Sequence, residues 1–197
     1  MKLLLVSDEE DRYLWEYYRP GCLKGIDMIL SAGDLKADYL SFLVTAANRP
    51  LLYVHGNHDG AYDRFPPEGC DCIDDRLIRV NGLRILGLGG SARYNGGPYQ
   101  YTERQMVRRI RRLQFQLRRA GGVDIVLTHA PVYGIGDEPN LTHRGFEAFL
   151  PLLDQWKPAF LVHGHVHRRY QPTADRVSRY GETVIINASG KYYLELE

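Results

Sequence analysis

Short apolar runs recur along the chain, and polar or helix-like segments separate them. Each run is five or six residues long and bounded by Gly, Asp, Asn or Pro, which is typical of buried strands in an α/β sheet. The runs cover residues 2–7, 28–32, 51–55, 123–128 and 159–163. The segments between them predict helices over residues 11–19, 37–47, 102–120 and 145–156.

A second group of strand-like segments adds hairpins to this alternation. Residues 76–80 and 84–88 flank Asn81-Gly82, a dipeptide that strongly favours a tight hairpin turn. The tail predicts another β pair, formed by residues 183–188 and 192–197. Alternating strands and helices with added hairpins predict an α/β fold of two sheets with helices on the outside. No stretch reads as a linker, so residues 1–197 are expected to form a single domain.

Composition and charge are those of an ordinary globular protein, with 44% hydrophobic and 25% charged residues and a net charge of +1. No apolar stretch approaches the ~20 residues of a membrane span, and no signal peptide is apparent. We therefore expect a cytoplasmic protein with no membrane partner. The segment 102–120 carries seven arginines, which could attract nucleic acid. Because the whole chain is nearly neutral, a solvated outer face is favoured over a nucleic-acid surface.

The three cysteines, Cys22, Cys70 and Cys72, indicate no disulfide framework, because their number is odd and no secretory signal precedes them. Cys70-Asp71-Cys72 could hold a metal, but no second cysteine pair completes a tetrahedral site. Reduced structural thiols are the favoured interpretation.

Metal-ligating residue types follow the ends of five predicted strands. In order, these ends read Ser7-Asp8-Glu9-Glu10, Gly33-Asp34, Gly56-Asn57-His58-Asp59, Thr128-His129 and His163-Gly164-His165-Val166-His167. In open α/β sheets, ligands gather beyond the carboxyl ends of the strands. Imidazole, carboxylate and amide oxygen together suit transition metals. They are more ligands than one metal needs, so we expect two metals roughly 3.5–4 Å apart.

The series of strand-end motifs, from Asp8-x-Glu10 to Gly164-His165-x-His167, resembles the calcineurin-like metallophosphoesterase superfamily. The resemblance spans residues 7–167 in the order and strand-end placement of that family. It implies a two-sheet metallophosphoesterase-like α/β sandwich with a binuclear metal centre.

Ligand roles follow from the resemblance position by position. Asp8, Asp34 and His167 would hold one metal. Asp34 would bridge to a second metal, which Asn57, His129 and His165 would complete. His58 would act near the substrate as general acid or transition-state stabiliser, and Asp59 would orient it.

Glu10 stands where the family pattern has a histidine. Its carboxylate can still bind a metal and would make the first site harder. Mn or Fe is therefore expected to be favoured, with Zn, Ni or Mg as alternatives. Glu9 is a weaker candidate for the same place.

The implied function is hydrolysis of a phosphodiester or small phosphomonoester by attack of a metal-bridging hydroxide. The expected partner is a small phosphorylated substrate. The alternatives are a metallophosphoesterase-like binding scaffold with weak or no catalysis, and a nuclease that uses the Arg-rich helix.

Further residues have more than one interpretation. His55 and His163 are expected to be hydrogen-bonded strand histidines rather than partners of the ligands. His143 and Arg144 could face substrate or belong to a surface cap. Residues 93–101 could form an aromatic rim over the site, although a packed surface loop is the commoner case.

Overall fold

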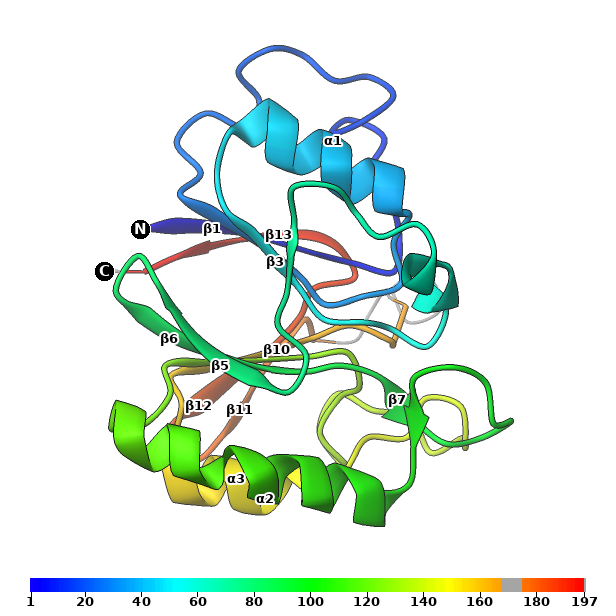
Figure 1. Cartoon of the computed structure of the whole chain (residues 1–197), viewed down its shortest axis with the longest axis vertical. Coiled ribbons are helices and arrows are strands. Elements are labelled where there is room, and N and C mark those ends of the chain that lie inside the picture. The colour runs from blue at the N-terminus through cyan, green and yellow to red at the C-terminus, as the bar shows by residue number, and fades with distance from the viewer. Residues whose placement is uncertain (168–174, 197) are drawn as a thin grey trace.

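The computed structural model describes residues 1–167 and 175–196, and it contains two main sheets that face each other (Figure 1). The first sheet has five strands, in which β1 to β4 run parallel and β13 pairs antiparallel with β1. Its order is β13 (Gly190–Glu195), β1 (Lys2–Ser7), β2 (Met28–Ser31), β3 (Leu51–Tyr53) and β4 (Asp71–Cys72).

The second sheet has six strands and contains the expected hairpin, in which Val80 pairs with Leu83 across Asn81-Gly82. Its order is β11 (Val177–Tyr180), β12 (Thr183–Asn187), β10 (Phe160–His163), β9 (Ile125–Thr128), β6 (Leu83–Leu88) and β5 (Arg76–Val80). A small ribbon pairs β7 (Ser91–Ala92) with β8 (Gln100–Tyr101).

Helices cover the outer faces of the two sheets, as the sequence predicts (Figure 1). Helix α1 (Ala37–Ala47) packs on the five-stranded sheet, while α2 (Glu103–Ala120) and α3 (Phe149–Trp156) pack on the six-stranded one. Between the sheets, Leu3 and Leu30 of the first share a core with Ile125 and Val162 of the second. This arrangement confirms the predicted α/β class. In the part of the chain that the structure describes, no helix is long and apolar enough to cross a membrane.

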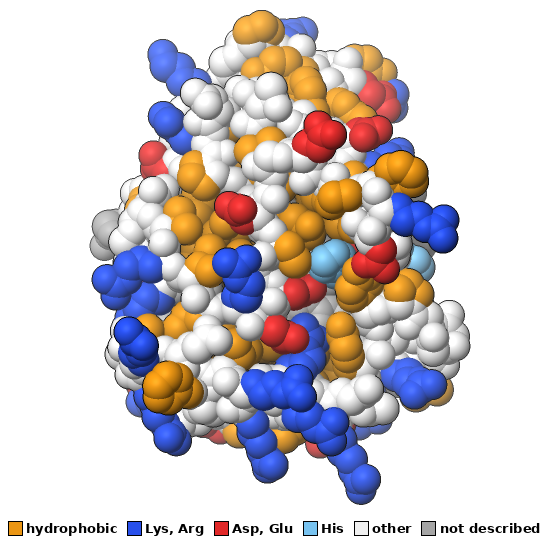
Figure 2. Space-filling model, in the orientation of Figure 1, with side chains coloured by type: hydrophobic (Ala, Val, Ile, Leu, Met, Phe, Trp, Pro, Cys, Tyr) orange, Lys and Arg blue, Asp and Glu red, His pale blue; other side chains and the backbone are white. Residues whose placement is uncertain are grey.

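Helix α2 buries one of its arginines. Arg109 is 7% exposed, donates to Asp75 Oδ1 at 2.7 Å and to the Gly89 carbonyl at 2.6 Å, and lies over the Tyr101 ring. Figure 2 shows Lys and Arg side chains gathered where Figure 1 places α2. Arg109 is therefore not part of the solvated face predicted for this helix.

The helix predicted over residues 11–19 is wrong, because this segment forms consecutive turns. Asp11 Oδ1 accepts hydrogen bonds from the backbone of Tyr13 and Leu14, and the N–H groups of Leu14 and Trp15 donate to carbonyls three residues back rather than four. Trp15 then lies against the Tyr39 ring at 5.3 Å, so the segment packs through its aromatic residues onto α1.

The predicted tail pair is also wrong in its pairing, although both strands exist. β12 pairs with β10 and β11 in the six-stranded sheet, whereas β13 pairs with β1 in the other sheet. The chain changes sheets between Asn187 and Gly190, where Gly190 has φ of 73° and Ser189 bridges Ser7. This change of sheet separates two strands that are adjacent in sequence.

Candidate metal centre

The residues that follow the parallel strands adopt unusual backbone conformations. Asp8, Asp34 and His165 have φ of 63°, 57° and 68°, in the left-handed region that side chains other than Gly seldom occupy. Such residues cost roughly 1–3 kcal/mol each and cluster at functional sites. Three of the predicted ligands therefore share the same backbone strain.

Two glycines allow the strand ends to approach one another. A Cβ on Gly56 would lie 1.9 Å from Asp34 Oδ1, and a Cβ on Gly164 would lie 1.8 Å from Ser7 Oγ. A side chain at Gly56 would therefore separate the loop after β2 from the loop after β3. A side chain at Gly164 would separate the loop after β1 from the loop after β10.

His129 lies at the centre of the cluster and is fully buried. Its Nδ1 is 2.7 Å from the Ala32 carbonyl, while its Nε2 is 3.1 Å from Asn57 Oδ1 and 3.3 Å from Asp34 Oδ2. Both ring nitrogens thus face oxygen acceptors. A neutral imidazole has only one N–H, so this arrangement requires a second positive centre, either a proton or a cation.

The electrostatics of His129 and Asp34 agree with this requirement. Burial opposes a charge on His129, but the adjacent Asp34 carboxylate raises the pKa of the imidazole to about 9. Burial would likewise raise the pKa of Asp34, yet His129 lowers that pKa well below its usual value. A negative carboxylate beside an enclosed ring that needs either a proton or a cation can form part of a metal site.

His165 presents the second imidazole. Its Nε2 lies 2.6 Å from the Thr142 carbonyl, which leaves Nδ1 as the acceptor nitrogen when Nε2 carries the proton. Burial and the neighbouring His129 lower the pKa of His165 to about 3, which favours the neutral ring. Metal-binding histidines commonly donate their other ring N–H to a backbone carbonyl. Ligand atoms of Asp34, His129 and His165 lie within 4.8 Å of one another.

Asn57 is oriented by a residue that the sequence did not single out. Tyr94 Oη lies 3.2 Å from Asn57 Nδ2, so the amide nitrogen faces the tyrosine and Oδ1 faces His129. Tyr94 belongs to the loop 93–101, for which the sequence left an aromatic rim or a packed loop open. Only the aromatic content of this loop indicated such a contact.

Asp8 lies where the β1 and β10 ends meet. Its carboxylate accepts hydrogen bonds from the His165 backbone N–H, at 2.9 Å to Oδ1, and from Ser7 Oγ at 2.6 Å. Burial raises the pKa of Asp8 above its usual value, and the charge of Asp34 adds to that effect. The structure thus places Asp8 beside the His165 loop.

The predicted role of Asp59 as the residue that orients His58 is not what the contacts show. Asp59 Oδ2 accepts hydrogen bonds from the backbone N–H groups of Gly56, at 2.7 Å, and Asp34, at 2.9 Å. It therefore joins two strand-end loops. Burial and the charge of Asp34 raise the pKa of Asp59 to about 6. His58 is exposed, and its backbone N–H donates to Asp34 Oδ1 at 2.8 Å.

Glu10 does not join the cluster of ligand atoms around His129. Its Oε1 accepts from the Lys36 backbone N–H at 3.1 Å and lies 4.0 Å from the Lys36 Nζ. Glu9 instead lies 3.5 Å from His167 Nδ1. Glu9, which the sequence ranked below Glu10, therefore places a carboxylate beside the predicted first-site histidine.

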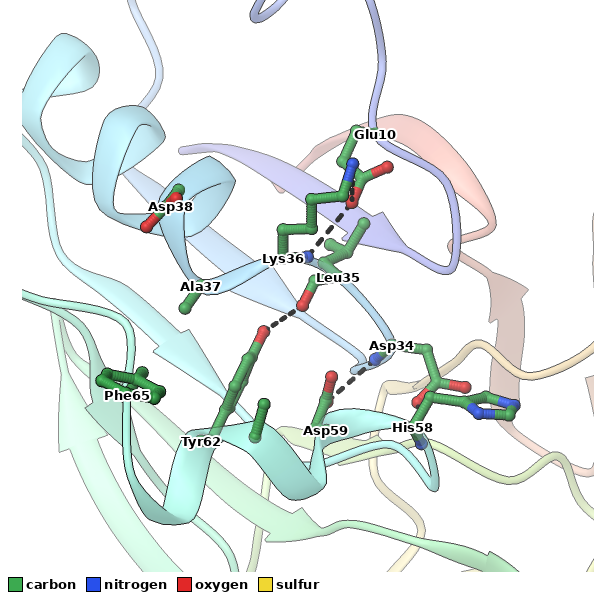
Figure 3. Close-up of a pocket in the computed structure, with 11 residues that line it drawn as sticks. Glu10, Asp34, Leu35, Lys36, Ala37, Asp38, His58, Asp59, Tyr62 and Phe65 are labelled. Carbon is green, nitrogen blue, oxygen red and sulfur yellow. Dashed lines mark hydrogen bonds and ion pairs between the residues drawn. The ribbon is translucent and has the colours of Figure 1, made fainter.

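A pocket of about 600 Å³ opens beside the cluster. Figure 3 shows His58 and Asp34 at one end of it and Phe65 at the other, with Tyr62 between them. Tyr62 Oη donates to the Leu35 carbonyl, so this side chain is fixed in the wall. Lys36 and Glu10 line the same pocket.

The remaining histidines have identifiable partners. His55 Nδ1 lies 2.7 Å from Asp74 Oδ2 and the ring stacks on Tyr99, which agrees with the expected hydrogen-bonded histidine. Burial opposes a charge on His55, but Asp74 raises its pKa to about 10.

His163 is buried, and burial lowers its pKa to about 4. The ring centroids of His143 and His165 are 5.3 Å apart. Arg144 instead forms an ion pair with Glu147.

Residues 7–169 match the sequence family described as calcineurin-like phosphoesterase. No curated protein matches the chain at a significant level. One solved structure matches with a TM-score of 0.69 and 15% identity, over 98% of this chain and 94% of its own. The TT1561 protein of Thermus thermophilus matches with a TM-score of 0.67 and 17% identity, over 96% and 89% of the two chains. Both structures are similar to this chain in fold.

Proposed function

We propose a specific reaction for this chain, which belongs to the calcineurin-like phosphoesterase family: hydrolysis of a phosphodiester or small phosphomonoester with two divalent cations. The observation that carries this proposal is the position of His129. Its enclosed Nε2 faces oxygen atoms of Asp34 and Asn57, an arrangement that a bound cation would satisfy.

The donor set fits the two cations that the family implies. Asp34, Asn57, His129 and His165 would hold one of them, and Asp8, Asp34 and His167 the other. Bound cations would neutralise the phosphoryl oxygens and lower the pKa of a water molecule toward 7. Mixed imidazole and carboxylate donors favour Mn or Fe, and Zn, Ni or Mg can also occupy such sites. Glu9, beside His167, is a better candidate for a first-site carboxylate than Glu10.

His58 is the residue proposed to assist the leaving group. It is exposed at the end of the pocket, and its backbone is held by Asp34 Oδ1. From this position the imidazole can donate a proton or a hydrogen bond to a departing oxygen. Asp59 acts as a positioning residue, because its carboxylate holds the backbone N–H groups of both Asp34 and Gly56.

The pocket supports a small substrate. Its volume of about 600 Å³ is in the range typical of small-molecule sites. Phe65 and Tyr62 supply apolar surface, and the cation of Lys36 can pair with an anionic group. The three free cysteines support the further proposal of a cytoplasmic location, where thiols stay reduced.

The test is hydrolysis of bis(p-nitrophenyl) phosphate and of p-nitrophenyl phosphate with added Mn²⁺. We expect activity on at least one substrate, loss of that activity with a chelator, and a kcat lower by ~10²–10⁴-fold in His58→Ala. Asp34→Asn should weaken metal binding as well. Asp154→Asn, the same change at an exposed position on α3, is the matched control.

Two outcomes would contradict the proposal. Folded protein that binds metal but hydrolyses neither ester would favour the binding scaffold. Equal kcat values for His58→Ala and the wild-type protein would remove the role of His58. Salt-sensitive binding of oligonucleotides would instead support the nuclease, for which the described contacts provide no specific argument.

A further inference from the structure

A second group of metal-ligating side chains lies outside the predicted centre. One ligand atom each of His55, Cys72 and Asp74 falls within 4.8 Å of the others. None of the three is among the ligands proposed above. Nitrogen, sulfur and carboxylate oxygen are the three donor types that Zn²⁺ uses in proteins.

The sheet register brings these residues together. β3 and β4 are parallel, with Tyr53 opposite Cys72. His55 and Asp74 each follow two residues later along their segments, so an extended backbone directs their side chains to the face that carries Cys72. The grouping is therefore a consequence of strand pairing rather than of a mobile surface.

The distances indicate converging donors. His55 Nδ1 lies 2.7 Å from Asp74 Oδ2 and 3.7 Å from Cys72 Sγ. One ring nitrogen carries at most one proton, which cannot point along both directions at once. A single cation between the three groups would engage all of them.

The surroundings fix the ligands in place. The Gly89 N–H donates to Asp74 Oδ1 at 2.8 Å, and the His55 ring stacks on Tyr99 with 4.2 Å between centroids and 13° between planes. A Cβ on Gly89 would lie 2.3 Å from Asp74 Oδ1, so this approach requires glycine. Hydrogen bonds of this kind orient metal ligands and raise affinity. The His55 and Asp74 side chains remain 13% and 17% exposed, which leaves a path for an ion.

We propose that His55 Nδ1, Cys72 Sγ and Asp74 carboxylate form a separate Zn²⁺ site, with water as the fourth ligand. Binding would displace the thiol proton and any proton on Nδ1, because both donors must present a lone pair. The ion would join the end of β3 to the segment after β4. Since Asn57 is two residues beyond His55, the same ion would restrain the loop that carries Asn57.

Co²⁺ distinguishes this site from the phosphoesterase centre. A thiolate ligand to Co²⁺ produces a near-ultraviolet charge-transfer band, and the ligands proposed for the phosphoesterase centre include no cysteine. We expect this band in the wild-type protein. The Cys72→Ser variant should lose the band and should bind one equivalent of Co²⁺ fewer than the wild-type protein. The Cys70→Ser variant should keep the band. Cys70 is the matched control because it lies two residues away and contacts the Glu68 carbonyl. Absence of the band in wild-type protein, or its persistence in Cys72→Ser, would overturn the proposal.

Alkylation of the wild-type protein tests the same site without a substitution. Zn²⁺ should slow iodoacetamide modification of Cys72 by at least tenfold and leave that of the exposed Cys22 unchanged. Equal rates at Cys72 with and without Zn²⁺ would contradict the site, whatever the phosphoesterase assay shows.

Discussion

Single residues determine how closely the strand-end loops approach one another. Asp8, Asp34 and His165 occupy left-handed backbone conformations, and Gly56 and Gly164 leave no room for a side chain. The site is therefore built from local strain that the packing around it must support.

Replacing Gly56 by Ala should disrupt the centre. The new Cβ would lie 1.9 Å from Asp34 Oδ1, so either the carboxylate or the Asn57 loop must move. We expect kcat/KM to fall by about 10²-fold, since misplacing reacting groups by ~1 Å has that effect. Steady-state kinetics with Mn²⁺ and isothermal titration of the metal measure the change.

Gly97→Ala is the control for this substitution. Its Cβ would meet only the ends of the Gln100 and Asn95 side chains, at 3.1 and 3.2 Å. A Gly56→Ala protein as active as Gly97→Ala would show that the Asp34 and Asn57 loops need not meet as described.

The sequence predicted which residue types gather at the site more reliably than it predicted their individual contacts. The strand-end motifs identified Asp34, Asn57, His129 and His165, which the structure brings together. The contacts of Asp59 and the choice between Glu9 and Glu10 depend on loop conformation. Neighbouring residues of the same type cannot be separated by spacing alone.

Individual elements are joined by charged contacts at the ends of strands. Arg84 Nη2 lies 2.5 Å from Asp124 Oδ1, and the Arg84 backbone N–H donates to Oδ2 at 2.7 Å. Arg84 Nη1 also donates to the Gly121 carbonyl at the end of α2. This network fixes β6, α2 and the segment leading to β9 relative to one another.

Asp124→Asn should reduce the free energy of unfolding by about 1–2 kcal/mol at pH 7, allowing for partial exposure of the pair. Hydrogen bonding to Arg84 lowers the pKa of Asp124 below 3.8. The carboxylate therefore stabilises the fold above pH ~4, and this stabilisation disappears as the pH falls through the lowered pKa. Urea unfolding at pH 7 and pH 3 measures the difference.

The matched control for Asp124→Asn is Asp71→Asn, at an exposed position on β4. It should change stability by less than ~0.5 kcal/mol. An Asp124→Asn effect that is the same at both pH values would contradict the role of the charge.

Helix α2 begins with a capping box. Thr102 Oγ1 accepts from the Gln105 N–H at 3.3 Å, and Gln105 Oε1 accepts from the Thr102 N–H at 2.7 Å. Thr102→Ala should therefore lower the free energy of unfolding by about 1 kcal/mol. Thr102→Ser keeps a hydroxyl at the cap and should retain most of the stability that Thr102→Ala loses. Thermal unfolding that ranks Ala and Ser equally would argue against the cap.

The apolar pattern predicted most helices and strands well, but it gave the wrong structure where local and long-range contacts compete. Helix α1 has the predicted bounds, because its apolar stripe packs on the first sheet. Residues 11–19 have helical spacing, yet the Asp11 turn and aromatic packing replace the helix. The partners of the two tail strands could not be predicted, because the apolar pattern of a strand does not specify which neighbouring strand it joins.

The whole molecule is a two-sheet metallophosphoesterase-like α/β sandwich in which both sheets contribute to one site. Asp34 and Asn57 follow strands of the five-stranded sheet, whereas His129 and His165 follow strands of the six-stranded sheet. The metal centre would therefore form only where the two sheets meet. The strand-end placement of these residues predicted that they gather, whereas the assignment of each ligand to one of two metals required the family resemblance.

Anomalous diffraction from crystals soaked in Mn²⁺ tests the central proposal most directly. We expect two adjacent peaks, roughly 3.5–4 Å apart. One should lie among Asp34, Asn57, His129 and His165, and the other beside Asp8, Asp34 and His167. A fully soaked crystal with no peak within bonding distance of His129 Nε2 would contradict the proposed metal centre.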